Sequence, residues 1–312
     1  MYFPILRGRQ FELLALRECI TNKILSEHII PILEPVKVSS TYTKTIETFI
    51  NANKKIAIIN NPQVGTWSKD LNKEGNIKIK EQITQQLLNE NLLSALYVTS
   101  DLSAQIDLLN SHGTTLDNLL LICNNPEYLD CYENVVGTNK PLYNIIPDKS
   151  DFRRRIRHNR VMCDDHFPKQ SRNIDYANID TEFFSSDHLY YSDDGYKGFS
   201  DYSVVGKEYN ETGFAPYAVA IHIVYFDEKD NLRIAHFVSD SNDDISDPAR
   251  KFSEAVKKLV EWNATMKINT LAMHKFKTAY ETQTYPGLGV IKKYSIMHHL
   301  ELMSQYLDKV QK

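Results

Sequence analysis

The chain has 312 residues, of which 42% are apolar and 24% are charged, so it can bury a large core and is neither disordered nor fibrous. Its formal net charge of −4 argues against attraction of the whole surface to nucleic acid or to an anionic membrane, although it leaves room for a local basic patch.

Neither the cysteines nor the apolar segments indicate an extracellular or membrane protein. The four cysteines have no C-x-x-C spacing, which favours reduced thiols over a disulfide framework or a zinc site. The sequence reaches Arg7 without the apolar region of a signal peptide, and no apolar run approaches the roughly 18 residues of a membrane span. We therefore expect a cytoplasmic protein without membrane contact.

Within residues 1–148 a β-branched apolar run is followed six times by a polar or proline-containing turn and a helix-patterned stretch. The runs are Tyr2–Leu6, Ile29–Leu33, Lys55–Ile59, Ala95–Thr99, Leu119–Cys123 and Leu142–Ile146. Strands that alternate with helices at this spacing pair in parallel, and repeated right-handed crossovers tend to close into a barrel. The pattern predicts an α/β fold, a TIM-barrel-like parallel β/α barrel.

Residues 149–216 break this rhythm and are interpreted as an insertion within a single barrel-like domain that spans residues 1–312. The insertion begins with a basic run, residues 153–158, and continues into an acidic and aromatic stretch. A long non-periodic segment in a compact domain is usually functional or disordered, and this one is too aromatic for disorder. We expect residues 173–213 to be ordered and to cover the barrel mouth or to bind a protein partner.

The rest of the sequence predicts a hairpin followed by three helices. The apolar runs 217–226 and 232–238 flank a five-residue polar turn, which suits an antiparallel hairpin. Pro248, which follows an aspartate, marks the start of a helix, and two further helical patterns span 270–280 and 289–307. We expect the hairpin to take part in closing the barrel and the helices to cap it.

Motifs from nearly the whole chain resemble one protein family. They are Tyr2–Leu16 with Ile30–Pro35, Gly195–Ser203, Ala220–His222, His236–Asp240 and Tyr285–Gly289. As a set these motifs resemble the beta protein family of bacterial and phage proteins. The resemblance implies a full-length, single-unit protein and, through the phage members of the family, a role in phage-related or defence biology. It implies no catalytic residues, because no activity is established for the family.

The residues that directly follow the predicted strands are the first site candidates, because chemistry in such folds takes place at the carboxyl ends of the strands. Arg7 and Arg9 follow the first strand and can grip a phosphate or carboxylate with their guanidinium groups. Glu34 follows the second strand and can serve as general base or metal ligand, and Asn60 follows the third. The alternative is a structural ion pair, either between Glu34 and one of the arginines or between Arg9 and Glu12.

Three carboxylates supply a candidate metal site. Asp164 and Asp165 precede His166, and Asp201 lies in a glycine-containing segment that allows close backbone approach. Hard cations prefer such oxygen ligands, so we expect Mg²⁺ or Mn²⁺ rather than structural zinc. The alternatives are an acidic pair that only solvates a turn and a capping role for Asp201.

Two histidines of the predicted hairpin are candidates for proton transfer. Strand alternation places His222 on a face of small residues, which is compatible with a barrel interior where an imidazole acts as acid or base. His236 is followed by Ser239 and Asp240, but no nucleophile-elbow glycine pattern surrounds the serine. The alternative for both histidines is a hydrogen-bonded position in the core.

The sequence leaves two classes of function open. The first is an enzyme, a metal-dependent, phosphodiesterase-like hydrolase or a lyase that acts on a phosphorylated or nucleotide-like substrate at the barrel mouth. In it the arginines hold the anion, the carboxylates bind the metal and His222 transfers protons. The second class is a non-catalytic module that recognises a protein or nucleic acid, in which the aromatic insertion stacks on bases or packs against the partner and the basic run either binds phosphate or forms surface ion pairs.

Overall fold

The computed structural model describes residues 1–211 and 216–310, which form two compact units. The first, the barrel unit, consists of Met1–Leu13, Glu27–Asp165 and Asp187–Tyr202. The second unit consists of Leu14–Ser26, His166–Ser186 and the described part of Ser203–Lys312. Of the segment 173–213 that the sequence predicts to be ordered, the last two residues lie outside the described residues.

Eight parallel strands make up the sheet of the barrel unit. In sheet order they are β1 (Ile5–Arg7), β2 (Ile32–Glu34), β3 (Ile56–Ile59), β4 (Leu92–Tyr97), β5 (Leu119–Ile122), β6 (Tyr143–Ile146), β7 (Arg160–Cys163) and β9 (Gly198–Ser200). A parallel bridge between Tyr2 and Phe199 joins β9 to the residues just before β1, so the sheet closes on itself. The TIM-barrel-like fold predicted from the sequence is therefore confirmed.

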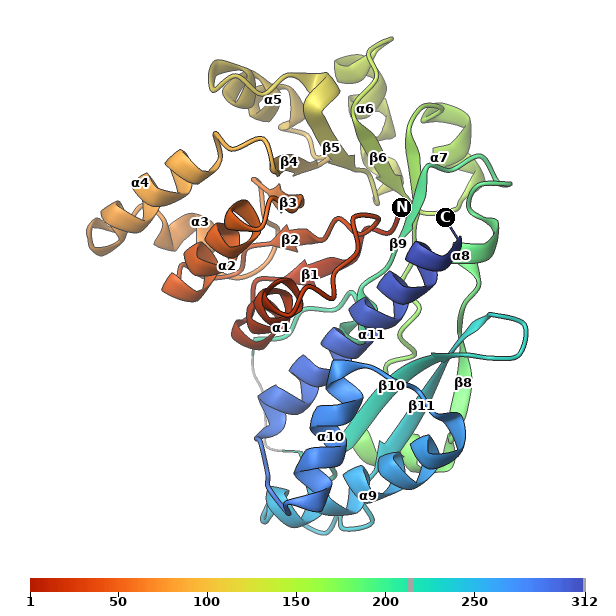
Figure 1. Cartoon of the computed structure of the whole chain (residues 1–312). Coiled ribbons are helices and arrows are strands. Elements are labelled where there is room, and N and C mark those ends of the chain that lie inside the picture. The colour runs from red at the N-terminus through yellow and green to blue at the C-terminus, as the bar shows by residue number, and fades with distance from the viewer. Residues whose placement is uncertain (212–215, 311–312) are drawn as a thin grey trace. The chain divides into compact units, whose positions relative to one another are not determined.

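Helices alternate with the barrel strands and lie outside the sheet, as Figure 1 shows between α2 and α8. They are α2 (Ser40–Asn51), α3 (Trp67–Asp70), α4 (Ile77–Gln86), α5 (Leu102–Ser111), α6 (Leu129–Val136), α7 (Ser150–Arg155) and α8 (Asp187–Tyr190). Most of α1 (Gln10–Thr21), which follows β1 in the chain, belongs to the second unit. Successive strand residues face opposite sides of the sheet. In β4, Ala95 and Tyr97 therefore join the inner cluster of the barrel, whereas Leu96, and Val98 just after the strand, pack outward with residues of α5 and α6.

The barrel closes through a tight seam between β9 and the first residues of the chain. The Phe3 amide donates to the Phe199 carbonyl at 2.9 Å, and the Phe199 amide donates to the Met1 carbonyl at 3.1 Å. A Cβ atom on Gly198 would lie 2.6 Å from the Met1 carbonyl oxygen and 2.7 Å from the Phe3 ring. A glycine at position 198 is therefore what allows the two strands to approach.

The second unit contains its own three-stranded antiparallel sheet, in the order β10 (Ala220–Phe226), β11 (Leu232–Val238) and β8 (Thr181–Ser185). The predicted hairpin is confirmed as β10 and β11, but the expectation that it helps to close the barrel is wrong. The seventh and eighth barrel strands, β7 and β9, instead come from residues 149–216. Their sequences, RVMC and GFS, are not the β-branched apolar runs that indicate the first six strands.

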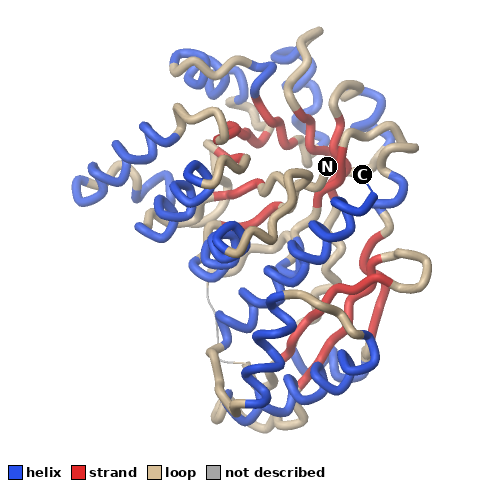
Figure 2. Tube along the Cα trace, in the orientation of Figure 1, coloured by secondary structure: helices blue, strands red, loops and turns tan. Residues whose placement is uncertain are grey.

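Three helices accompany this sheet, as Figure 2 shows in blue beside the red strands. They are α9 (Pro248–Met266), α10 (Leu271–Glu281) and α11 (Leu288–Val310). One face of the hairpin, with Ile221 and Ile223, packs on α9 and α10. Along α11 the buried His298 bridges the Thr270 hydroxyl at 2.9 Å and the Val224 carbonyl at 2.7 Å, which fixes that helix to β10.

The seam predicts a cost for any side chain at position 198. We expect Gly198→Ala to lower the free energy of unfolding by about 1–3 kcal/mol, because the added methyl group overpacks the closing strands. Urea unfolding of the whole chain measures this cost. Gly75→Ala is the matched control, since a Cβ atom there meets nothing within 4 Å. Equal stability of the two variants would contradict the close approach at the seam.

Candidate functional site

The innermost positions at the carboxyl ends of several barrel strands hold polar rather than aliphatic residues. Continuing the inward alternation of β1 and β2 beyond Ile5 and Ile32 leads to Arg7 and Glu34. Arg7 is 7% exposed and Glu34 is fully buried. Tyr97 of β4 and Tyr202, just after β9, are buried in the same inner cluster. We call Arg7, Glu34, Tyr97 and Tyr202 the polar layer.

The carboxylate of Glu34 is held by three donors. Arg7 forms an ion pair with it through Nη1, and the Tyr97 hydroxyl donates to Oε2 at 2.9 Å. The main-chain amide of Gln63 donates to Oε1 at 2.8 Å. A buried carboxylate needs such partners, because taking an ion out of water costs several kcal/mol. The structural ion pair that the sequence left as an alternative is therefore present for Arg7.

Arg7 also stands over an aromatic ring, with its Cζ 5.7 Å from the centroid of Tyr202. A cation over a phenol ring is attracted by its electron-rich face. Burial raises the pKa of the Tyr202 phenol far above its usual value, and burial also raises the pKa of Tyr97 against the opposing influence of Arg7. Both phenols therefore remain protonated at neutral pH and act as hydrogen-bond donors.

The loop after β3 supports the polar layer from the side. Asn61 imitates a strand residue, because its amide group donates to the Tyr97 carbonyl at 2.9 Å and accepts from the Tyr97 amide at 2.8 Å. Gly65 has a φ of +79° and passes so close to Val36 that a Cβ atom on Gly65 would lie 2.2 Å from the Val36 carbonyl oxygen. This packing holds the loop where Gln63 reaches Glu34.

The other candidates of the barrel unit make local contacts. Asp201 is buried and accepts a 2.7 Å hydrogen bond from the Tyr2 hydroxyl. Asp164 is exposed and accepts from the amide of Asp165 at 2.8 Å. The side-chain amide of Asn60 donates to the Ile58 carbonyl at 3.2 Å. Within residues 1–211 and 216–310, no three His, Cys, Asp or Glu side chains gather in a way that could hold a metal ion, so the magnesium or manganese site stays a prediction, as does anion binding by Arg9.

Two arginines of the basic run take part in ion pairs within the barrel unit. Arg153 contacts Asp148 at 2.6 Å, and Arg155 contacts Asp130 and Glu133 of α6. These contacts agree with the alternative of surface ion pairs for this run.

The histidine candidates belong to the second unit rather than to the barrel. His222 and His236 face each other across β10 and β11. Asp240 pairs with Lys258 at 2.7 Å, and the Ser239 hydroxyl accepts from the Val219 amide and donates to the Ser241 carbonyl. The serine and aspartate therefore serve the main chain and a surface ion pair. Glu34 and His222, both named as catalytic candidates, lie in different units.

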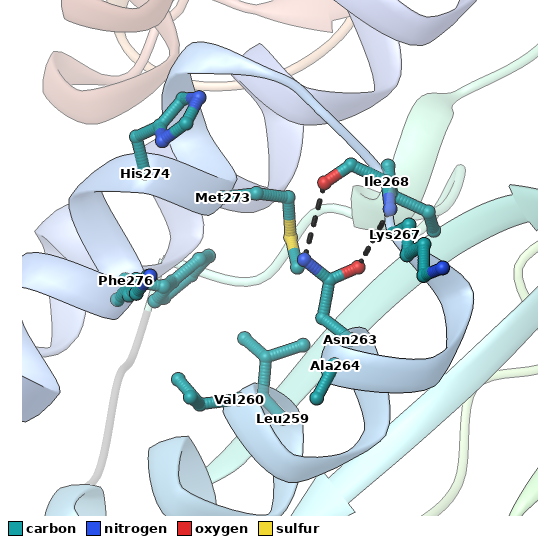
Figure 3. Close-up of a pocket in the computed structure, with 10 residues that line it drawn as sticks. Leu259, Val260, Asn263, Ala264, Lys267, Ile268, Met273, His274 and Phe276 are labelled. Atoms are coloured by element: carbon teal, nitrogen blue, oxygen red, sulfur yellow. Dashed lines mark hydrogen bonds between the residues drawn. The ribbon is translucent and has the colours of Figure 1, made fainter.

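A cavity of about 260 Å³ lies between α9 and α10 of the second unit. Figure 3 shows apolar side chains such as Leu259, Met273 and Phe276 around it. Asn263 bonds the main chain of Ile268 through both side-chain atoms, at 3.1 and 2.9 Å. Among the polar side chains that line this cavity, Asn263 thus ends a helix, and His274 bonds Asn269 at 2.7 Å.

Comparisons with known proteins leave the family open. The chain matched no family model, no curated protein and no solved structure, so the resemblance to the beta protein family stays a prediction. No helix of the described residues has the length and apolar character to cross a membrane.

The ion pair in the polar layer predicts a non-additive response to mutation. Arg7→Met leaves the Glu34 carboxylate buried without its cation, so we expect a loss of about 3–5 kcal/mol in the free energy of unfolding. Adding Glu34→Gln removes that charge and keeps an acceptor for Gln63, so the double variant should recover most of the loss. Urea unfolding of the two single variants and the double variant provides the cycle. Additive losses would show that the two side chains do not interact.

Proposed function

We propose that the barrel unit is an enzyme whose active site is the polar layer at the carboxyl end of the barrel. The observation that carries this proposal is the replacement of aliphatic residues by Arg7, Glu34, Tyr97 and Tyr202 at the inner positions of that end. Barrel interiors are normally filled by branched aliphatic residues. Replacing a buried ion pair by well-packed apolar residues is often neutral or stabilising, so stability alone does not account for this layer.

The chemistry of the layer favours a small anionic substrate, of the phosphorylated or nucleotide-like class. Arg7 supplies a permanent positive charge in a planar group that matches phosphate or carboxylate oxygens. Glu34 holds Arg7 in position and neutralises its positive charge until a substrate binds. The two protonated phenols then donate hydrogen bonds to the bound group. Such hydrogen bonds stabilise the negative charge that hydrolysis or elimination develops on that group.

Recognition of a protein partner through residues 173–213 is the second candidate function. The specific observation that favours it is the exposure of a large apolar side chain in this segment, Phe183 on β8 of the second unit, at 55%. Aromatic residues that are exposed in the free protein are common anchors of interfaces. This candidate requires no reaction at the polar layer.

Competition between Glu34 and a bound anion gives the test of the enzyme proposal. Titration calorimetry would compare adenosine 5′-monophosphate with uncharged adenosine as probes. Glu34→Gln removes the negative charge that competes with the anion for Arg7, so binding of the monophosphate should become tighter. The double variant Arg7→Met/Glu34→Gln should bind the monophosphate roughly tenfold or more weakly than the wild type, since hydrogen bonds to charged groups contribute about 1.5–3 kcal/mol.

The control is Lys54→Met, which removes a cation that pairs with Glu27 and precedes β3, at the opposite ends of the strands. This variant should bind the monophosphate like the wild type. Equal affinity for adenosine and its monophosphate, or wild-type affinity in the double variant, would exclude an anion site in the polar layer and leave recognition as the function.

A further inference from the structure

Three ionisable side chains form a line across the sheet of the second unit. His222 of β10 and His236 of β11 are direct cross-strand neighbours, and their Nδ1 atoms are 2.7 Å apart. The Nε2 atom of His236 is 2.9 Å from Oε1 of Glu182 on β8. Each of the three strands thus contributes one member of a continuous chain of hydrogen bonds.

The line is enclosed by aromatic rings. The Tyr176 ring lies 4.6 Å from that of His236 and 4.7 Å from that of His222, measured between centroids. Phe167 stands edge-on to His222 at 5.2 Å. His236 is buried, whereas the carboxylate end at Glu182 is 28% exposed. The Glu182 end of the line therefore reaches solvent, whereas His236 in the middle is buried.

Hydrogen-bond chemistry determines where the protons are when both imidazoles are neutral. An ionised carboxylate only accepts, so His236 must donate to Glu182 from Nε2. The Nδ1 atom of His236 is then an acceptor and requires a donor, which is the Nδ1–H of His222. This assignment leaves the lone pair of His222 on Nε2. Burial, together with the neighbouring His236, lowers the pKa of His222 to about 3, which keeps this imidazole neutral.

His222 borders a cavity of about 250 Å³ in the second unit. Its polar lining is Asn173, Lys292 and Ser295, and most of the remaining wall is apolar, with Val219, Leu288 and Ile291. Among the described residues, no side chain or main-chain group hydrogen-bonds to Nε2 of His222. The cavity thus combines a neutral base, a cation and an apolar wall.

We propose that Glu182, His236 and His222 form a proton relay that makes His222 Nε2 a general base for a small ligand in this cavity, one with an anionic group and an apolar body. Lys292 is the cation that attracts the anionic group, and the apolar wall takes the body. The relay lies wholly in the second unit. It is independent of the active site proposed for the barrel unit.

The proton transfer balances without any further reactant. Nε2 of His222 accepts a proton from a hydroxyl group or a water molecule in the cavity, and that oxygen is left as the nucleophile. The proton on Nδ1 of His222 then moves to Nδ1 of His236. The positive charge ends on His236 beside the carboxylate of Glu182, where an ion pair stabilises it. His222 is neutral again, now with its proton on Nε2.

The tautomer of His222 tests the relay directly. In ¹⁵N-histidine-labelled wild-type protein at neutral pH, we expect the Nε2 of His222 to give the nitrogen shift of an unprotonated imidazole nitrogen and its Nδ1 that of a protonated one. The ring should not titrate between about pH 5 and 8, whereas an unperturbed histidine does so. The charged or titratable groups that face it are His236, Glu182, Tyr176 and Lys292. A proton on Nε2 of His222 would overturn the proposal, and this measurement needs no variant.

Protection from diethyl pyrocarbonate tests the ligand class, because this reagent modifies the unprotonated nitrogen of histidine. We expect phenyl phosphate to slow modification of His222, as followed by peptide mass spectrometry, and uncharged phenol at the same concentration to have little effect. Lys292→Met should abolish the protection. Lys257→Met is the matched control, since Lys257 is exposed and lies on α9 near Glu261, outside the cavity lining. Equal protection by the two probes, or protection that survives Lys292→Met, would overturn the assignment of an anionic ligand.

Discussion

The pairing of β9 with residues 1–5 is the constraint on which the barrel unit depends. Both strands at this seam have only three residues, so a few main-chain hydrogen bonds convert an open sheet with two free edges into a closed one. Closure also brings Tyr202, which follows β9, over Arg7 at the end of β1. The geometry of the polar layer is therefore a consequence of the close approach between Gly198 and the residues before β1.

The two units bury ionisable groups in different ways. An arginine keeps its charge at every accessible pH, so Arg7 can enter the barrel only with Glu34 and the donors that surround that carboxylate. An imidazole can enter an apolar face as a neutral group, and burial favours that form. The barrel unit thus holds a fixed charge pair, whereas the second unit holds protons that can move along a line. His298, which is tied to Thr270 and to the main chain, shows the purely structural use of a buried histidine.

Much of the fold could be predicted from the sequence, because six barrel strands are β-branched runs followed by helical patterns. The strands β7 and β9 could not, since the short segments Arg160–Cys163 and Gly198–Ser200 carry no readable alternation and owe their pairing to closure of the barrel. The strand β8, which carries Glu182, was missed for another reason: its five residues, TEFFS, do not alternate between apolar and polar side chains. The inward position of Tyr97 could have been predicted, because the strand alternation that places Ala95 inside the barrel also places Tyr97 there.

For the site, the sequence placed Arg7 and Glu34 at strand ends but could not choose between an ion pair and a free anion site. That choice depends on the register of β1 and β2, which sets the two side chains opposite each other. The pairing of His222 with His236 could be predicted more directly from the sequence. A hairpin that turns at Phe226 and Leu232 places these residues opposite each other by counting back along both strands. The shape of their surroundings, with Tyr176 and Phe167 against the rings, comes only from the folded chain.

The charge states of the two clusters imply different costs for binding an anion. In the polar layer an incoming anion competes with the buried carboxylate of Glu34 for Arg7, and any displacement leaves that carboxylate poorly compensated in a medium of low dielectric. A strongly charged group such as a phosphate is the class that can meet this cost. In the cavity of the second unit the base is neutral, so an anion beside Lys292 displaces no charge from His222. A weakly charged ligand with more apolar surface therefore suits the second site, because burial of that surface supplies most of the binding free energy.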